Sequence, residues 1–543
     1  MGARVVVRAR PRARSLAWRP PACAAPHRDR SRGDIVIDHR DTPSADEAAG
    51  HASVSPTRRA VLRGSLGVAA GATATGSALA PSAYAAEQPP APADPSAAGP
   101  AARHWQTRLD ALAARHQVPG AALGILSGNR VTKIATGMAN VDDRIEATPD
   151  TVWQIGSVTK VWTATVAMRL VDEGLLDLDT PVTRVMPELR LSDPERTARL
   201  TLRHLLTHTS GIDGDVLTDT GRGDDCLERY AALLGGVRGV HPLGRVHSYC
   251  NAGLMLTGRL IERVTGTTWD AALHDRLLKP LGLTRTHTLP EDVLAHRAAA
   301  GHTWERDRPP HVNPAPIPRS SGPAGIVCSS VEDVLTFARL HLDDGRGPDG
   351  TRILSSRSAE AMRSRWTDTP DTADSGETRG LGWARWDWNG RTAYGHDGTT
   401  HAQASFLRIL PDARIAVVLL TNGGDNAALH VDLFREIFTA LAHVAPRPQH
   451  TPDGTTPPRD AGGYLGRYPA TGIVEEVLER DGALYVRRTF EGRAPSEFRL
   501  LPAGRDLYVH RVSDTREWQT IKFFTLDGTR YLYRGGRVVA HDG

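Results

Sequence analysis

The chain has 543 residues, of which 40% are hydrophobic and 24% are charged, with a formal net charge of +4. This length excludes a single small domain and leaves room for a large core and two or three folding units. Thirteen Arg and six acidic residues lie within residues 1–85, so the remainder carries a net charge of −3. The charge therefore gives no reason to expect a nucleic-acid partner.

An export signal is predicted over residues 54–85. This segment combines the pair Arg58-Arg59, an apolar run over 64–80 and a small-x-small sequence at 83–85. The order is typical of a twin-arginine signal peptide, which predicts a secreted or cell-envelope protein. The apolar run is too short and too rich in Gly to be a stable membrane span.

Strand and helix patterns alternate in blocks over 102–445. A helical pattern over 103–116 precedes two apolar runs, 121–126 and 130–136, that flank a hairpin turn. A helix is expected from Ser157 to Glu173. Further helices are expected over 202–206, 226–234 and 252–264, strands near 395 and over 405–410 and 415–421, and a last helix over 427–442. Early and late strands around a helical middle predict one antiparallel sheet with helices on its faces, an α+β domain.

A Pro-rich stretch then leads into a segment with strand patterns alone. The turns Asp481-Gly482 and Asp527-Gly528 each separate two short apolar runs, which predicts two hairpins in a small all-β domain. In chain order we expect an Arg-rich leader over 1–53, the signal peptide over 54–85, a Pro- and Ala-rich linker over 86–101, the α+β domain over 102–445, a Pro-rich linker over 446–460 and the all-β domain over 461–543.

The motif Ser157-x-x-Lys160 is the first candidate for chemistry. Only four of the 66 basic residues are Lys, and Lys160 stands three residues after Ser157. On a helix the two side chains share a face. Arg keeps its proton in a protein, whereas a desolvated Lys amine can lose it and then accept the serine proton. The motif predicts a serine nucleophile at a helix start, where the helix dipole favours developing negative charge.

Tyr249 and Asn251 form the only Tyr-x-Asn sequence in the chain, ahead of the helix expected over 252–264. A tyrosinate held near a cation can shuttle a proton, and an Asn side chain can orient a Lys amine or a substrate amide. The alternative interpretation is a buried Tyr followed by an Asn that caps the helix.

The third motif is His396-Asp397-Gly398, at the start of a predicted strand and before Thr399. A strand edge beside a nucleophile can supply a backbone N–H to an oxyanion, and Gly allows the close approach. The His-x-Gly pattern also recurs at the very end of the chain, so its position after the other two motifs carries the prediction.

In this order the three motifs resemble those of the β-lactamase and penicillin-binding protein superfamily. The Tyr-x-Asn and His-x-Gly versions are similar to those of the branch that holds class C β-lactamases, D-alanyl-D-alanine carboxypeptidases and related esterases. Further stretches extend the resemblance over about 103–442, namely Leu205 to Gly211, Pro323 to Gly325 and Gly380 to Trp383. It implies a β-lactamase/transpeptidase-like antiparallel sheet with an all-helical cluster, and an exported serine hydrolase that acts on an amide or ester through an acyl-enzyme.

The resemblance also implies the site residues and their roles. Ser157 would attack the acyl carbon, while Lys160 and Tyr249 would manage the protons. The backbone N–H groups of Ser157 and Thr399 would form the oxyanion hole. Substrate would be bound by Asn251, His396, Gly398 and Thr399. We expect no metal and no organic cofactor, and the partner would be a small molecule or a peptide like a peptidoglycan stem.

Several alternatives stay open on the sequence alone. Asp397 stands where many relatives have Thr or Ser; facing the site, it would repel the carboxylate of β-lactams and peptidoglycan stems, and facing away it would not. The alternative to a hydrolase is a penicillin-receptor-like protein that is acylated without turnover. A disulfide among Cys226, Cys250 and Cys328 is possible, and the oligomeric state is open.

Overall fold

The computed structural model describes residues 99–305, 308–313, 316–370, 376–454, 461–511 and 518–542, which belong to one compact unit, Pro89–Gly543. The predicted leader and signal peptide lie outside the described residues, as do nearly all of the first linker and part of the second. None of the helices in the described ranges has the length and apolar character needed to cross a membrane.

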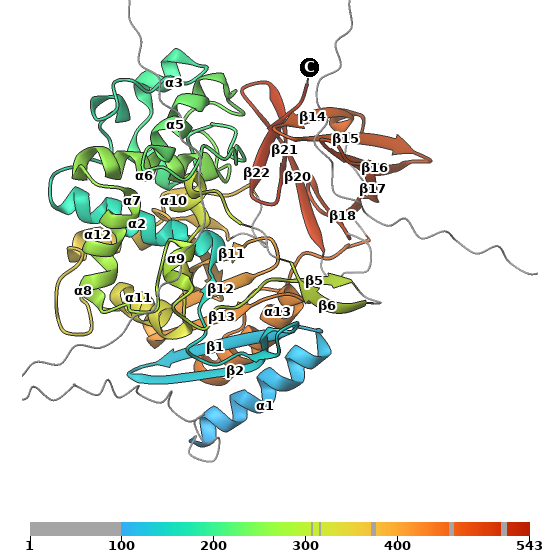
Figure 1. Cartoon of the computed structure of the whole chain (residues 1–543). Helices are drawn as coiled ribbons and strands as arrows, with labels where there is room; N and C mark the ends of the chain where they lie inside the picture. Colours follow the sequence, from blue (N-terminus) through green and yellow to red (C-terminus); the bar gives the residue numbers. More distant parts are fainter. Residues whose placement is uncertain are drawn as a thin grey trace, which may run out of the picture. The chain divides into compact units, whose positions relative to one another are not determined.

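A nine-stranded antiparallel sheet, in the order β3-β2-β1-β13-β12-β11-β10-β9-β8, lies at the centre of the α+β part (Figure 1). The early hairpin and the late strands meet where Ala121 of β1 pairs with Thr421 of β13, as the sequence predicts. The strands are β1 Gly120–Ser127, β2 Arg130–Asn140, β3 Ile145–Glu146, β8 Thr367–Asp368, β9 Thr378–Arg379, β10 Ala384–Trp388, β11 Arg391–Thr399, β12 Ala404–Leu410 and β13 Ile415–Thr421.

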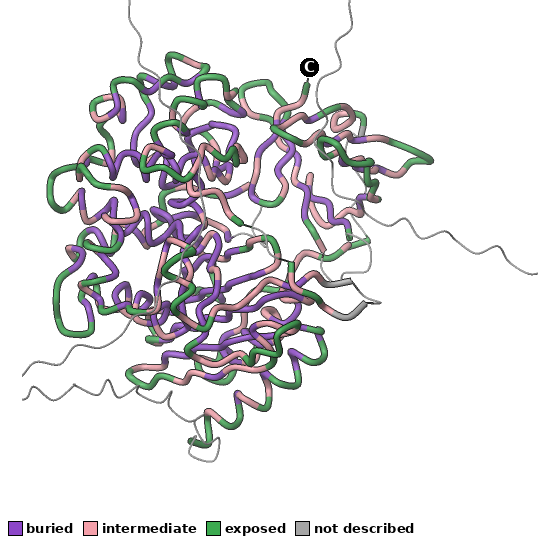
Figure 2. Tube along the Cα trace, viewed as in Figure 1, coloured by how far each residue is buried: buried purple, intermediate pink, exposed green. Residues whose placement is uncertain are grey.

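Helices cover both faces of this sheet. Side chains alternate along a strand, so Val417 packs against α1 (Pro100–Arg115) and α13 (Asn426–Ala442), and Val418 packs into a larger helical cluster. Figure 2 shows the buried residues concentrated in this sheet and cluster. The cluster and its connections contain α2 Thr159–Asp172, α3 Pro194–Arg199, α4 Leu202–Leu206, α5 Cys226–Leu233, α6 Asn251–Thr265, α7 Trp269–Leu273, α8 Lys279–Leu281, α9 Pro290–Val293, α10 Gly322–Gly325, α11 Val331–Leu342 and α12 Ser356–Arg363. The predicted α+β fold with an all-helical cluster is confirmed.

Two short ribbons accompany the main sheet, and sequence periodicity gave no sign of them. One pairs β4 (Trp153–Gln154) with β7 (Cys328–Ser329), and the other pairs β5 (His302–Glu305) with β6 (Arg308–Val312). Strand β4 of the first ribbon lies just ahead of Ser157 in the chain. Its pairing with β7 holds this part of the chain against the segment that follows α10.

The C-terminal strands form two antiparallel sheets, β14-β15-β16-β17 and β18-β19-β20-β21-β22, as an all-β part. Both predicted hairpins are present, and Asp481 and Asp527 have the positive φ, 51° and 50°, that a tight hairpin turn requires. Tyr468, Val486 and Phe523 are buried in a core of their own. The strands are β14 Gly466–Ala470, β15 Ile473–Arg480, β16 Ala483–Phe490, β17 Ser496–Arg499, β18 Leu501–Gly504, β19 Leu507–His510, β20 Gln519–Leu526, β21 Thr529–Arg534 and β22 Arg537–Ala540.

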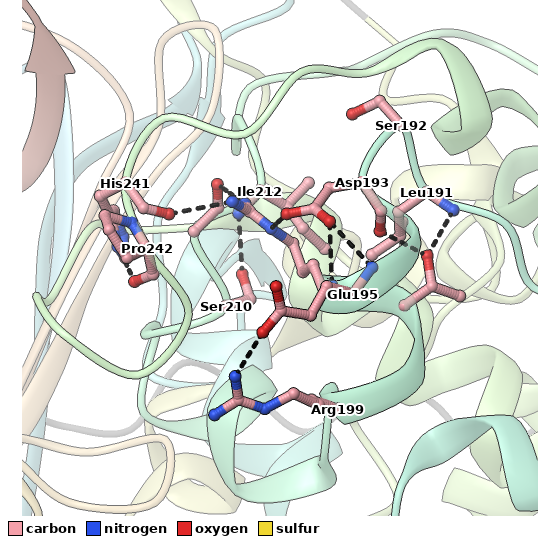
Figure 3. A network of polar contacts seen from close by, with 12 residues as sticks. Leu191, Ser192, Asp193, Glu195, Arg199, Ser210, Ile212, His241 and Pro242 are labelled. Carbon is pink, nitrogen blue, oxygen red and sulfur yellow. Dashed lines mark hydrogen bonds and ion pairs between the residues drawn. The ribbon is translucent and has the colours of Figure 1, made fainter.

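Figure 3 shows hydrogen bonds that fix the segment around α3. Asp193 caps this helix by accepting from Glu195 N at 2.9 Å, and Glu195 pairs with Arg199 at 2.7 Å. The buried Arg196 guanidinium donates to the carbonyls of Gly211 and of His241, the latter at 3.1 Å. These bonds hold the backbone that leads directly into residues 213–215.

Trp162 offers a test of the core beneath the catalytic motif. It is fully buried in α2 and stacks on Phe337 with ring centroids 4.2 Å apart. Trp162→Ala should lower the free energy of unfolding by about 3–5 kcal/mol, because it leaves a large cavity. Urea unfolding followed by circular dichroism measures this change. Trp366→Ala is the matched control at a residue 39% exposed, and an equal loss there would contradict the assignment of the core.

Candidate active site

A cavity of about 400 Å³ opens between the helical cluster, the end of β11 and the β21–β22 turn. Five of the residues predicted from the sequence line it: Ser157, Tyr249, Asn251, His396 and Thr399. The other two, Lys160 and Gly398, lie directly behind Ser157. The structure thus brings together all seven predicted residues from three distant parts of the chain, and their catalytic roles remain a prediction.

Ser157 lies in a 3-10 turn, Gly156–Val158, and α2 begins at Thr159, two residues after the predicted start. The turn keeps Ser157 on the same face as Lys160. Lys160 Nζ donates to Ser157 Oγ at 2.9 Å and to the carbonyl oxygen of Ala324 at 2.7 Å. Both acceptors are uncharged, and no carboxylate pairs with Lys160 among the residues that the structure describes.

The Lys160 amine is fully buried. Its pKa is lowered from 10.5 to about 7, mainly by burial and in smaller part by the positive charge of Arg537. Near neutral pH a large fraction of Lys160 is therefore the free amine, which can accept the hydroxyl proton of Ser157.

Tyr249 is the second proton-bearing group at Ser157. Its ring lies under Lys160 Nζ, 4.9 Å from the ring centroid, and its hydroxyl is hydrogen-bonded to Ser157. Burial raises the pKa of Tyr249 to about 12. Tyr249 is therefore a neutral phenol at physiological pH, and the tyrosinate considered from the sequence does not form there.

Asn251 is the first residue of α6, but it does not cap that helix. The cap is Cys250, whose Sγ accepts from Gly253 N at 3.3 Å. Asn251 Nδ2 instead donates to Asp215 Oδ1 at 2.8 Å. With its N–H₂ group oriented in this way, Asn251 presents its carbonyl oxygen as a hydrogen-bond acceptor.

His396 is neutral. Burial lowers its pKa to about 3, with the charges of Lys160 and Arg379 acting in the same direction. Its Nδ1 lies 2.6 Å from the Asp397 carbonyl oxygen and so carries the proton, while Nε2 is buried without a hydrogen-bond partner. The sequence left the charge of His396 undecided. In the structure the ring is neutral, and its Nε2 is a hydrogen-bond acceptor.

Two glycines let the ends of the motifs approach each other. A Cβ on Gly156, whose φ is 49°, would lie 2.7 Å from Thr399 N, and one on Gly398 would lie 2.8 Å from Ser157 N. Real Cβ contacts are longer, so only Gly allows this backbone packing. The backbone segments that carry Ser157 and Thr399 thereby pack directly against each other, and their role as an oxyanion hole remains a prediction.

Asp397 borders the cavity, but its charge is matched. Arg408 donates to both of its carboxylate oxygens, at 2.5 and 2.9 Å. Burial favours the neutral acid, yet the charge and hydrogen bonds of Arg408 outweigh it and keep the pKa of Asp397 below its usual value. Asp397 therefore borders the site as one partner of an ion pair. The sequence allowed either a carboxylate that faces the site and repels the substrate or one that faces away, and this arrangement lies between the two.

The sequence gave no sign of two residues that complete this site, Asp215 and Arg537. Arg537 donates through two nitrogens to the Asp215 carboxylate and lies over the Tyr249 ring, 5.1 Å from its centroid. Its neighbour Gly536 accepts from Tyr249 N at 2.7 Å. Gly535-Gly536, both with positive φ, marks a hairpin turn in the sequence, but nothing local shows where that turn docks.

The three cysteines left open by the sequence, Cys226, Cys250 and Cys328, are free thiols. Burial raises the pKa of Cys250 to about 11, so this thiol beside Tyr249 stays protonated. It serves as a helix cap.

A serine hydrogen-bonded to a buried lysine, in an antiparallel sheet flanked by a helical cluster, is the arrangement of a serine hydrolase or acyltransferase. Comparison with known proteins agrees, since the Beta-lactamase family model matches residues 105–442. Penicillin-binding protein 4 of Amycolatopsis lactamdurans is 44% identical over 374 residues, 68% of this chain and 98% of the relative. The chain belongs to the β-lactamase family of serine hydrolases, which includes the penicillin-binding proteins.

Solved structures show the same fold. SurE is 28% identical, with a TM-score of 0.69 over 81% of this chain and 99% of that chain, and its structure with D-Leu gives 0.67. A class C β-lactamase from Rhodobacter sphaeroides, 24% identical, gives a TM-score of 0.51 over 63% of this chain and 100% of its own.

The buried amine predicts a pH profile. Because only neutral Lys160 can take the serine proton, the rate of Ser157 acylation should rise about tenfold per pH unit below 7 and level off above it. Single-turnover acylation by an activated ester, followed from pH 5 to 9, measures this dependence. A rate that falls with rising pH would contradict a lysine base.

Arg537→Gln should move this profile to higher pH. The substitution removes a positive charge and leaves Asp215 unpaired, and both changes favour protonated Lys160. Arg245→Gln is the matched control, because it breaks an exposed ion pair that also joins the α+β part to the C-terminal part, where its partner Asp527 lies. An equal profile for both variants would exclude an electrostatic role for Arg537.

Proposed function

We propose that this protein hydrolyses an amide or ester of a D-amino-acid-like acyl group through an acyl-enzyme on Ser157, in the manner of a D-alanyl-D-alanine carboxypeptidase or a related esterase. The observation that carries the proposal is the buried Lys160 amine, which donates to Ser157 Oγ at 2.9 Å and has no carboxylate partner among the described residues. No metal or organic cofactor takes part in the proposed steps.

Acylation begins with proton transfer from Ser157 Oγ to neutral Lys160. The oxygen then attacks the carbonyl carbon of the substrate, and the negative charge that develops on the carbonyl oxygen is stabilised by the N–H groups of Ser157 and Thr399. Because Lys160 is buried, a large fraction of it is unprotonated and can accept the proton of the serine hydroxyl that it contacts.

The leaving group needs a proton, and its proposed source is protonated Lys160. Protonated Lys160 returns its proton through the Tyr249 hydroxyl, which is hydrogen-bonded to Ser157 and stays a phenol between transfers. Water then repeats the attack on the ester of Ser157, with Tyr249 and Lys160 taking its proton. As the acid is released, this proton passes to the departing Ser157 Oγ, which restores the serine hydroxyl and the free amine of Lys160.

Substrate recognition is proposed for Asn251 and His396. The Asn251 carbonyl oxygen and His396 Nε2 are both acceptors, so they suit an N–H group of a peptide-like substrate. A D-amino-acid-like acyl group is supported by SurE, 28% identical to this chain, whose structure was solved with D-Leu.

Export and domain organisation also stay proposals. We infer export through a twin-arginine-type signal from the residues at 54–85, which fall outside the described part of the chain. We propose boundaries at 102–445 for the catalytic domain and 461–543 for the all-β domain, since each part has a hydrophobic core of its own.

Hydrolysis of a panel with nitrocefin, a D-Ala-D-Ala peptide and p-nitrophenyl esters tests the proposal. At least one compound should be turned over, and Ser157→Ala should lose that activity by roughly 10⁴-fold or more. Lys160→Arg should lose nearly as much, because it keeps the charge and removes the base.

Two results would contradict the proposal. Normal turnover by Lys160→Arg would exclude the lysine as the base. A burst of one acyl group per protein without steady hydrolysis would instead indicate a penicillin-receptor-like binding protein.

A further inference from the structure

The stretch from Leu205 to Gly211 contains a histidine that the proposed mechanism does not use. His208 is 2% exposed, and its ring stacks on the Tyr249 ring with centroids 4.7 Å apart and an angle of 26° between the planes. Its Nδ1 accepts from the backbone N–H of Cys250 at 3.0 Å, and its carbonyl oxygen accepts from Ser248 N at 2.8 Å. This histidine therefore contacts Tyr249 and both residues beside it.

Two features of His208 cost stability. Its φ is 58°, in the left-handed region that a residue with a Cβ seldom adopts. Burial holds the pKa of His208 well below its ordinary value of 6.5, so the ring is neutral. Because Nδ1 accepts a hydrogen bond, the proton is on Nε2, which is buried with no hydrogen-bond partner among the residues that the structure describes. Costs of both kinds gather at functional sites, which makes His208 a candidate for a role at Tyr249.

A second ring packs against His208. His247 is fully buried, and its ring meets the His208 ring edge to face with centroids 5.7 Å apart. His247 Nδ1 lies 3.1 Å from the hydroxyl oxygen of Tyr533 in β21. These contacts leave the His208 ring little freedom to move, so it can fix the position of the Tyr249 ring stacked on it.

We propose that His208 is a positioning residue that holds Tyr249 in place for proton transfer at Ser157. The inference rests on the proposed acyl transfer to Ser157 and deepens it. The stacked ring limits the orientations open to the Tyr249 side chain, and the hydrogen bond from Cys250 N fixes the backbone next to it. Proton transfer requires the phenol within hydrogen-bond reach of Ser157, and a displacement of about 1 Å can lower a rate by roughly 100-fold.

Substitutions of His208 can separate its side chain from its backbone conformation. Asn and Gly both adopt positive φ readily, but only Asn offers an oxygen near the place of Nδ1 that can accept from Cys250 N. In single-turnover acylation by an activated ester, His208→Gly should lower the rate by roughly 10- to 100-fold, whereas His208→Asn should stay within about fivefold of wild type. His208→Gln, whose amide lies near the place of Nε2, should lose nearly as much as His208→Gly and replaces it if that variant does not fold.

His241→Asn is the matched control. His241 is also a buried histidine whose Nε2 has no hydrogen-bond partner in the described part of the chain, but its Nδ1 lies 2.9 Å from the Pro242 carbonyl oxygen and its ring does not stack on Tyr249. This variant should leave the acylation rate near wild type. Urea unfolding of every variant shows whether a change in rate merely follows a change in stability.

Crystal structures of the variants without substrate separate this proposal from the proposed function, because they show the place of Tyr249 whether or not the protein hydrolyses an ester. The Tyr249 hydroxyl should stay hydrogen-bonded to Ser157 in His208→Asn and move away by about 1 Å or more in His208→Gly or His208→Gln. Tyr249 in its wild-type place in the latter variants, or acylation by them as fast as by His241→Asn, would overturn the proposal. Failure of wild type to form an acyl-enzyme would overturn the proposed function instead, and the crystal structures would then decide on His208.

Discussion

The chemistry of this protein depends on the burial of one amine. Lys160 is held by the uncharged oxygens of Ser157 and Ala324, and the side chains packed around it exclude water. A carboxylate in contact would have fixed its proton, whereas neutral acceptors leave the pKa low, about 7. In the proposed mechanism the hydrophobic core beneath α2 therefore sets the protonation state of the base, Lys160.

The C-terminal sheets are part of the site and not only an appendage to it. The β21–β22 turn brings the Gly536 carbonyl to Tyr249 N and sets Arg537 against Asp215. The first contact fixes the backbone of the Tyr-x-Asn motif, and the second orients Asn251 through the shared carboxylate. In the proposed mechanism the positive charge of Arg537 then helps to lower the pKa of the proton acceptor, Lys160.

The sequence predicted the parts of the site that local geometry or motif order determines. Helical spacing places Lys160 beside Ser157, and the order of the motifs placed Tyr249 and His396 with them. Asp215 and Arg537 could not be predicted, because their contacts arise from tertiary packing; the two residues are 322 positions apart in the chain. Likewise the turns Asp481-Gly482 and Asp527-Gly528 predicted an all-β part, but nothing local predicted where the Gly535-Gly536 turn ahead of β22 docks.

The most direct test of this account is the location of the covalent intermediate. Wild-type protein mixed with an activated ester at pH 8 and quenched in acid should carry one acyl group on the peptide that contains Ser157, as mapped by tandem mass spectrometry. Lys160→Arg treated in the same way should carry almost none, although its serine is intact. An acyl group on any other residue, or equal labelling of the Lys160→Arg protein, would contradict a serine activated by a buried lysine.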